Sequence, residues 1–214
     1  MSTTDSIVLA SNNAHKRDEI IRALPHAAGV LITPGELRAE FGPAPDPVED
    51  GADYLANATI KAKEFARWSG RLALADDSGL AIDALDGRPG LYSARYAGEN
   101  ATFADNIARV FEELDGVTPE MRTARFICVL VICDGDERVV EVEGICPGRI
   151  LSAPEGSDGF GYDPIFVPDG ESRSFATMTA DEKDAISHRG RALVALGEAL
   201  RGHAHPLLER LAPA

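Results

Sequence analysis

The sequence has no apolar run of membrane-spanning length and only three cysteines among its 214 residues. It begins with the polar stretch MSTTDS, which lacks the basic and apolar regions of a cleaved signal peptide. Cys128, Cys133 and Cys146 lack the paired spacing of a metal site, and two of them lie in strand-like segments. We therefore expect a cytoplasmic protein with no membrane partner, whose thiols are reduced, buried and inert.

The sequence also lacks any tract rich in lysine and arginine. It contains 21 Lys and Arg residues against 35 Asp and Glu residues, which gives a formal net charge of −14. Such a charge repels a polyphosphate backbone, so we expect no nucleic-acid partner. A small anionic ligand remains compatible, provided that a few cations converge on it or a metal ion screens its charge.

The order of patterns predicts a single α/β domain over residues 1–214 with a mixed sheet. Apolar runs at residues 7–11 and 30–33 are typical of buried strands, and residues 126–146 are typical of a long antiparallel hairpin. Helical spacing predicts helices after the loop NNAHK, over residues 53–68, over residues 102–114 and from Thr179 onward. Residues 34–51 and 155–166 are expected to be loops.

Two adjacent carboxylates follow the apolar run LALA at residues 72–75, and we expect them at a strand end. Successive strand residues point to opposite sides, so one of Asp76 and Asp77 can face a ligand while the other anchors the neighbouring loop. Ser78 and Gly79 favour a tight turn after them. Such a carboxylate suits a magnesium ion or a water to be deprotonated, although an isolated Asp pair is more often a solvated strand end or a turn-capping pair.

Other candidate residues lie on a strand-to-helix loop and on a helix. The loop Ser11-Asn12-Asn13-Ala14-His15-Lys16 precedes a helix amino terminus, where free amide groups and the helix dipole attract anions. Lys61 shares a helix face with Asn57, four residues earlier. A plain connection and a solvated lysine are the alternative interpretations.

The segment from Ser157 to Pro164 combines glycines, aromatic residues and acids, a mixture that can place a flat ring against an aromatic face. A glycine-rich turn with its aromatic residues in the core is the alternative. Lys183, His188 and Arg189 follow in one helical region, and they can donate hydrogen bonds to a carbonyl or phosphate oxygen or else lie on the surface.

Six motifs occur in one order along nearly the whole chain, and together they resemble the inosine/xanthosine triphosphate pyrophosphatase family. They are Ser11 to Lys16, Asn57-Ala58-x-x-Lys61-Ala62, Ala75-Asp76-Asp77-Ser78-Gly79-Leu80, Pro89-Gly90-x-Tyr92-Ser93-Ala94-Arg95-Tyr96, Gly159-Phe160-Gly161-Tyr162-Asp163-Pro164 and Ser187-His188-Arg189-Gly190.

The resemblance implies two lobes around a central nucleotide-binding cleft, a homodimer, and magnesium as cofactor. It implies hydrolysis of inosine, deoxyinosine or xanthosine triphosphate between the α- and β-phosphates, which gives the monophosphate and pyrophosphate and cleanses the nucleotide pool. Asp77 would be the catalytic residue, and the metal would be held by Asp77, Glu49 and Asp76. The implied substrate-binding residues are Ser11, Asn12, Asn13, Ala14, His15, Lys16, Lys61, Ser78, Phe160, Gly161, Tyr162, Asp163, Lys183, His188 and Arg189.

The chain departs from the family pattern at two positions. Asn12 occupies a loop position that is usually glycine, and asparagine tolerates a left-handed backbone better than most residues. Ala56 stands where many members carry glutamate, so one expected carboxylate is missing and Glu49 is its substitute.

Two other classes of protein share part of this pattern. A magnesium-dependent phosphoacceptor domain combines paired acids with a lysine, but it has no need of the long hairpin or the FGYDP loop. A non-catalytic nucleotide sensor would keep the pocket and lose the base.

Overall fold

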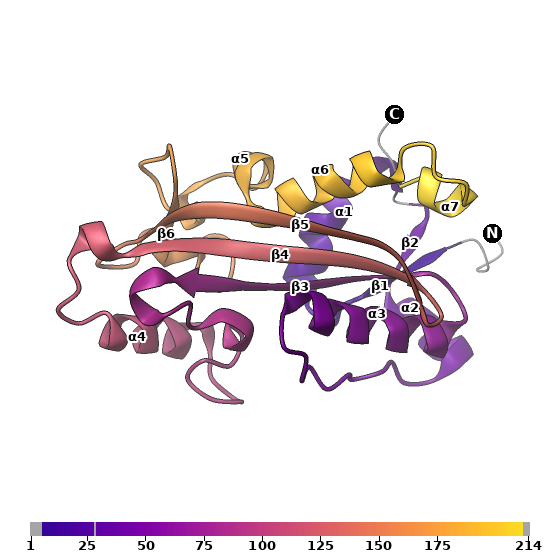
Figure 1. Cartoon of the computed structure of the whole chain (residues 1–214), viewed down its shortest axis with the longest axis horizontal. Helices are drawn as coiled ribbons and strands as arrows, with labels where there is room; N and C mark the ends of the chain where they lie inside the picture. The colour runs from indigo at the N-terminus through magenta and orange to yellow at the C-terminus, as the bar shows by residue number, and fades with distance from the viewer. Residues whose placement is uncertain (1–5, 28, 212–214) are drawn as a thin grey trace. The chain divides into compact units, whose positions relative to one another are not determined.

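The structure, a computed structural model, contains a six-stranded mixed sheet with helices packed against it (Figure 1). It describes residues 6–27 and 29–211. The strand order is β2-β1-β3-β4-β5-β6. The strands are β1 (Ile7–Ala10), β2 (Leu31–Ile32), β3 (Ala73–Ile82), β4 (Thr123–Asp134), β5 (Glu137–Ile150) and β6 (Phe166–Pro168). The helices are α1 (Ala14–Ala23), α2 (Pro34–Phe41), α3 (Tyr54–Ser69), α4 (Phe103–Glu113), α5 (Ala180–Ile186), α6 (His188–Leu200) and α7 (Pro206–Glu209).

Strand direction confirms the predicted mixed α/β class. β1 pairs in parallel with β2 and with β3, whereas β5 pairs antiparallel with β6. Gly148 in β5 allows the β5–β6 pairing, because a Cβ there would lie 2.3 Å from the carbonyl oxygen of Val167. The hairpin is longer than predicted, since its strands extend to Thr123 and Ile150.

Internal contacts divide the chain into two compact units. The first comprises the described residues up to Asp77, Cys128–Gly144 and those from Ala192 onward, and the second comprises Ser78–Ile127 and Ile145–Arg191. β3, β4 and β5 therefore contribute residues to both units. The single domain and the central cleft stay predictions.

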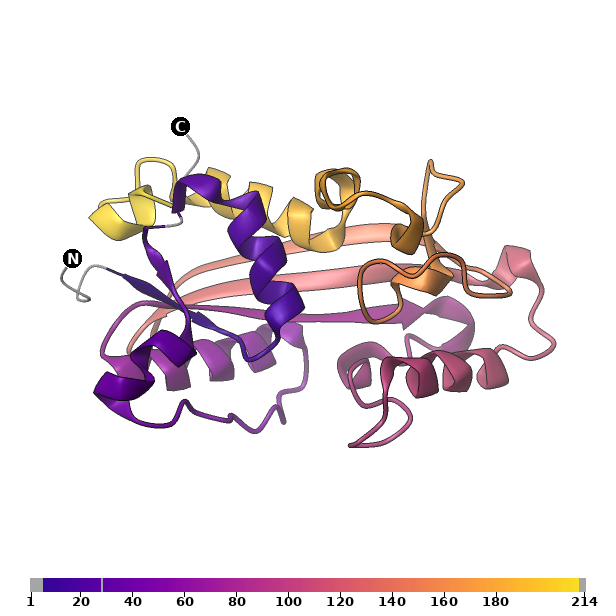
Figure 2. The ribbon, with the colours of Figure 1, turned by 180° about the vertical axis from the view of Figure 1, so that it is seen from behind.

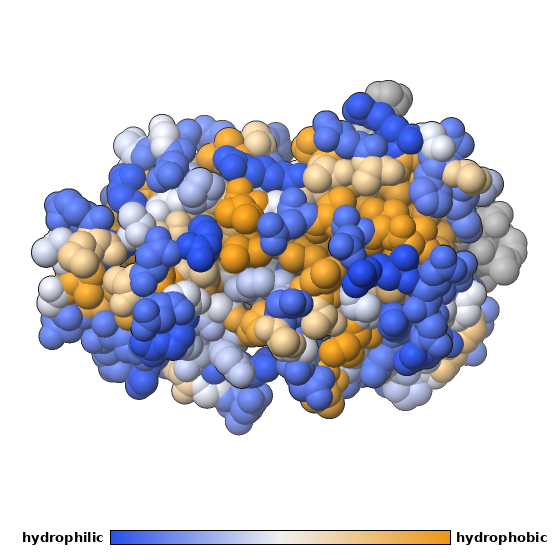
Figure 3. Space-filling model, in the orientation of Figure 1, coloured by the Kyte–Doolittle hydropathy of each residue, from blue (hydrophilic) through white to orange (hydrophobic). Residues whose placement is uncertain are grey.

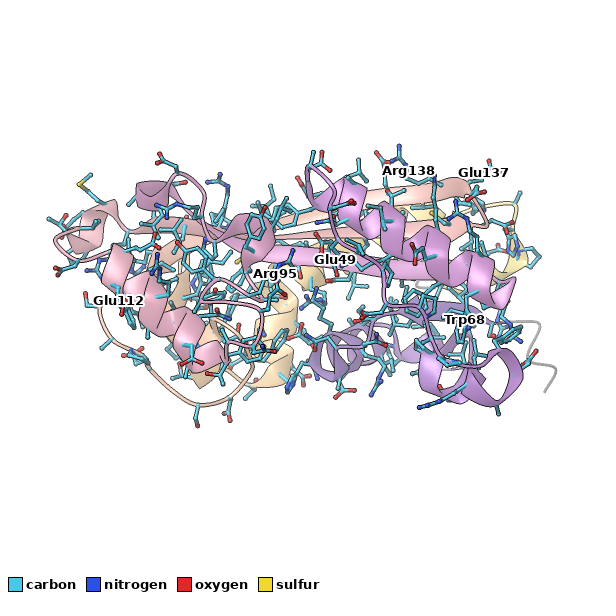
Figure 4. All side chains as sticks on the ribbon, turned by 90° about the horizontal axis from the view of Figure 1, so that it is seen from below. Glu49, Trp68, Arg95, Glu112, Glu137 and Arg138 are labelled. Carbon is cyan, nitrogen blue, oxygen red and sulfur yellow. The ribbon has the colours of Figure 1, made fainter. Side chains whose placement is uncertain are left out.

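In the first unit, helices cover both faces of the strands. α1 and α6 lie on one side and α3 lies on the other (Figures 1 and 2). Ile20 on α1 and Leu196 on α6 join Leu9 and Leu74 in one buried core. On the α3 side, the side chain of Trp68 lies between α3 and α2 (Figure 4). Its indole N–H donates to the carbonyl oxygen of Phe41 at 3.2 Å.

The second unit has its own apolar core. It contains Leu80 from β3, Val110 from α4, Phe126 from β4 and Phe166 from β6. The predicted start of α4 is confirmed, because Thr102 accepts a hydrogen bond from the backbone N–H of Asp105 at 3.2 Å. This core supports the glycine-rich segment that follows β5.

Two sequence predictions are wrong. β3 runs straight through Ser78 and Gly79 to Ile82, so Asp76 and Asp77 lie within the strand, and no turn follows them. α2 begins at Pro34 inside the predicted loop. Its signal is Thr33 followed by Pro34 and Glu36, since the Glu36 carboxylate accepts the Thr33 backbone N–H at 2.8 Å.

Apolar residues also reach the surface of the first unit, and Figure 3 shows them gathered where β4 and β5 run beside α6. A hollow of about 180 Å³ in this unit is lined by Leu55, Val129, Glu141, Val142 and Glu143. None of these residues is a predicted site residue.

Among the described residues, no helix combines the length and apolarity that crossing a bilayer requires.

Candidate active site

The loop between β1 and α1 forms a helix amino terminus with a side-chain cap. α1 begins at Ala14, earlier than predicted, so Ala14, His15 and Lys16 occupy its first turn. The Asn13 side chain accepts the backbone N–H of Lys16 at 3.2 Å. The positive end of the α1 dipole therefore lies at this loop.

Asn12 needs no left-handed backbone here. Among the described residues, Asp86 is the one non-glycine residue with a positive φ. The loop therefore forms without the glycine that the family pattern places at this position.

Asp76 and Asp77 point to opposite sides of β3, as strand alternation predicts. Asp76 forms an ion pair with Lys16, whose Nζ lies 2.5 Å from Oδ1. Asp77 forms an ion pair with Lys61 on α3, with Nζ and Oδ1 2.7 Å apart. Asp76 thus anchors the loop and α1, while Asp77 faces α3.

Lys61, Asp77 and Glu49 form a buried charge cluster in the first unit. Lys61 Nζ also lies 3.2 Å from Glu49 Oε2, so both carboxylates converge on one ammonium group. Lys61 is only 9% exposed, so it is not the solvated lysine of the alternative interpretation.

Burial and neighbouring charges have opposing effects on the pKa values of this cluster. Burial raises the pKa of Asp77 to about 6, against the opposing attraction of Lys61 and Lys16. Burial also works to lower the pKa of Lys61, but the carboxylates of Asp77 and Glu49 outweigh it and raise that pKa. At pH 7 Lys61 is therefore charged and Asp77 is mostly ionised, which is the state that a general base requires.

A backbone contact holds Glu49 close to α3. The Asn57 side chain accepts the backbone N–H of Gly51 at 2.8 Å. A Cβ on Gly51 would lie 2.7 Å from both Asn57 Oδ1 and Ala56 Cβ, so only glycine allows this approach. Figure 4 shows Glu49 in the segment that leads into α3.

The donor set around Lys61 fits magnesium, which prefers oxygen ligands and is usually held by one or two carboxylates with substrate phosphates. Asp77 and Glu49 converge, whereas Asp76 lies on the other side of β3 against Lys16. Within residues 6–27 and 29–211, no group of three or more His, Cys, Asp or Glu side chains is placed to hold a metal ion. A metal there would need phosphate or water oxygens to complete its shell.

In the second unit, Asp163 organises the glycine-rich segment. Its Oδ2 accepts the backbone N–H of Phe160 at 2.8 Å and pairs with Lys183 Nζ at 2.6 Å. Lys183 Nζ lies 4.9 Å from the centre of the Phe160 ring. Gly159 must be glycine, because a Cβ would lie 2.2 Å from Asp163 Oδ2.

The two aromatic residues of this segment have different environments. Tyr162 is 4% exposed and belongs to the core of the second unit, where its hydroxyl donates to the carbonyl oxygen of Ser93 at 2.9 Å. Phe160 is half-buried, so its ring is the one that a ligand can contact. Gly161 lies between them with a φ of 63°.

His188 and Arg189 are buried rather than on the surface. The His188 ring stacks on Phe126 with the centroids 4.6 Å apart. Arg189 Nη2 donates to the hydroxyl of Ser78 at 3.0 Å, and its guanidinium lies 5.8 Å from the Phe160 ring. Phe160, Lys183 and Arg189 therefore form one aromatic–cation group.

Sequence reasoning missed one contact in the first unit. The thiol of Cys128 on β4 donates to Asp76 Oδ2 at 3.1 Å. All three cysteines are free and buried, as predicted, but this one touches a candidate site residue. No local pattern identifies such a contact, because it depends on β3 and β4 being neighbours.

The chain is similar to known proteins over most of its length. A family model described as the Ham1 family matches residues 7–199. A dITP/XTP pyrophosphatase of Geobacillus kaustophilus is 45% identical over 192 residues, which cover 90% of this chain and 92% of that protein. One of Shouchella clausii is 47% identical over 163 residues, 76% of this chain and 82% of that protein.

Solved structures agree with these relatives. A HAM1 protein from Coxiella burnetii matches with a TM-score of 0.81 and 40% identity, covering 91% of this chain and 98% of that one. A nucleoside-triphosphatase, or dITP/XTP pyrophosphatase, from Mycobacterium abscessus matches with a TM-score of 0.72 and 42% identity, covering 92% and 100%.

Proposed function

The chain belongs to the Ham1 family, and from that premise we propose how its residues act. It is a hydrolase that cleaves non-standard purine nucleoside triphosphates to the monophosphate and pyrophosphate. The relatives named dITP/XTP pyrophosphatase support this activity. The observation that carries it on this chain is the pairing of Asp77, with its pKa raised to about 6, and the charged Lys61 beside it.

Asp77 acts as the general base. It takes a proton from the attacking water, whose oxygen bonds to the α-phosphorus as the bond from that phosphorus to the bridging oxygen breaks and pyrophosphate leaves. Lys61 stabilises the negative charge that shifts toward the leaving pyrophosphate. Lys16 and the amino-terminal end of α1, where the helix dipole is positive, bind the phosphates.

Magnesium is the proposed cofactor, held by Asp77 and Glu49. When bound, it neutralises phosphate charge and polarises the phosphoryl oxygens. Asp76 contributes by holding Lys16 in place. Removal of magnesium with a chelator should abolish pyrophosphate release.

The aromatic–cation group binds the purine. Phe160 offers a ring face, and Lys183 and Arg189 offer donors to the six-oxygen of inosine or xanthosine. Adenosine carries an amino group there, which leaves those donors unsatisfied at a cost of about 1 to 3 kcal/mol each. Guanosine shares the six-oxygen, so its rejection requires a group that opposes its two-amino group.

The test compares kcat/KM for inosine, xanthosine, adenosine and guanosine triphosphates at saturating magnesium, with pyrophosphate release as the readout. We expect the first two to exceed the last two by roughly a hundredfold or more. Equal kcat/KM values for inosine and adenosine triphosphates would refute both the assignment of the purine pocket and the role in cleansing the nucleotide pool.

The alternative functions are not favoured. The family match spans residues 7–199, far more than a phosphoacceptor pattern of acids and a lysine. A sensor without catalysis would have no need of a base placed like Asp77. We also propose that the protein is cytoplasmic and forms a homodimer. Gel filtration at micromolar concentration tests the dimer.

A further inference from the structure

Cys128 makes a contact to which the proposed reaction assigns no role. Its Sγ lies 3.1 Å from Asp76 Oδ2, a short separation for a thiol that donates to a carboxylate. Both side chains are fully or nearly fully buried, since Cys128 is 0% and Asp76 is 2% exposed. The contact therefore lies in an environment where hydrogen bonds to charged groups are strong.

The contact extends to the loop that is proposed to bind phosphate. The other oxygen of Asp76, Oδ1, lies 2.5 Å from Lys16 Nζ. A carboxylate is planar, so a donor fixed at Oδ2 sets the direction in which Oδ1 faces. Cys128 on β4, Asp76 on β3 and Lys16 on α1 thus form one chain of contacts within the first unit.

We propose that Cys128 is a positioning residue for the hydrolysis. Its thiol fixes the Asp76 carboxylate, which in turn fixes the Lys16 ammonium where the substrate phosphates bind. The inference rests on the proposed function, because the effect on catalysis passes through Lys16 and the triphosphate.

The chain offers a matched control on the same strand. Cys133 is also a free cysteine of β4 with 0% exposure, and it lies five residues from Cys128, on the opposite face. Cys133→Ala removes the same atoms from the interior without touching Asp76. A purely structural role for a buried thiol predicts similar effects of the two alanine variants.

The experiment measures kcat and KM for inosine triphosphate in wild type and in Cys128→Ala, Cys128→Val, Cys128→Ser and Cys133→Ala. Loss of a hydrogen bond to a charged group should lower kcat/KM by roughly tenfold in the alanine and valine variants, with part of the loss in KM. Serine keeps a donor, so it should stay within about threefold of wild type, and Cys133→Ala should stay near wild type.

A second background tests the route through Lys16. In Lys16→Ala, the further change Cys128→Ala should cost nothing, because the ammonium that it positions is gone. Wild-type kinetics in both Cys128→Ala and Cys128→Val, a serine variant no better than alanine, or full additivity with Lys16→Ala would each overturn the inference. Thermal unfolding shows which variants fold, and if alanine does not, the valine and serine pair decides. An inactive wild type refutes the proposed function itself.

Discussion

Replacing Asp77 with asparagine removes the proposed base while keeping the shape of the side chain. The pKa of Asp77, raised by burial to about 6, leaves about nine-tenths of the carboxylate ionised at pH 7. An amide can neither accept the proton of water nor balance the charge of a metal. We expect Asp77→Asn to lower kcat by a hundredfold or more, the scale of one positioned base.

The pH profile gives an independent check with a defined sign. Lowering the pH protonates Asp77 and removes the base, so wild-type kcat should fall as the pH drops through the pKa of this group. A bound divalent cation favours the ionised form, so the midpoint should lie at or below about 6. Asp77→Asn should lose this limb of the profile.

The assay is pyrophosphate release from inosine triphosphate with magnesium, together with nucleotide binding by calorimetry. Nucleotide binding should largely survive in Asp77→Asn, because the 3.2 Å ion pair between Lys61 and Glu49 remains and holds Lys61 in place. Asp134→Asn, a change at the exposed end of β4, serves as the matched control with wild-type kinetics. An Asp77→Asn protein that retains most of its rate would move the base to another acid, with Glu49 first because it shares Lys61 with Asp77.

Two further variants and one labelling experiment test other parts of the two units. Lys61→Ala should raise KM and lower kcat, since a cation on the phosphates counts for more as charge moves to the leaving group, whereas half-buried Lys63→Ala on the same helix should leave both unchanged; wild-type kinetics in Lys61→Ala would contradict its assignment. Asp163→Asn leaves Lys183 buried without its 2.6 Å partner, so urea unfolding should show a loss of about 3 kcal/mol, and no loss would mean that the pair is not formed in solution. Native protein at pH 8 should resist alkylation by iodoacetamide, because all three thiols are buried and burial raises the pKa of Cys146 to about 11; rapid labelling would show an opening that the structure lacks.

The elements that could be predicted are those whose signals lie within a few neighbouring residues. The strand and loop before α1, the helical face that carries Asn57 and Lys61, and the hairpin strands all follow from periodicity and turn chemistry. The capping pair at Thr179 marks the start of α5 for the same reason. The opposite directions of Asp76 and Asp77 needed only the alternation of a strand.

The features that escaped prediction depend on tertiary partners. Ser78 and Gly79 favour a turn locally, yet β3 continues because β4 lies beside it in the sheet. The Cys128 contact needs the same pairing of strands and leaves no trace in the spacing of residues along the chain. Tyr162 looked equivalent to Phe160, but packing sends one ring into the core and leaves the other half-buried.

The alanine at position 56 illustrates how helix geometry decides what a substitution means. Successive helix residues are about 100° apart, so position 56 lies about 140° around α3 from Lys61, whereas Asn57 shares the face of Lys61. Position 56 faces the preceding loop, since a Cβ on Gly51 would lie 2.7 Å from Ala56 Cβ, so a glutamate there would not point directly at Lys61. The carboxylate that matters reaches Lys61 from the preceding loop, which Asn57 holds through Gly51. The departure at Ala56 thus leaves the Lys61 cluster intact, and the residue on which that cluster depends is Asn57.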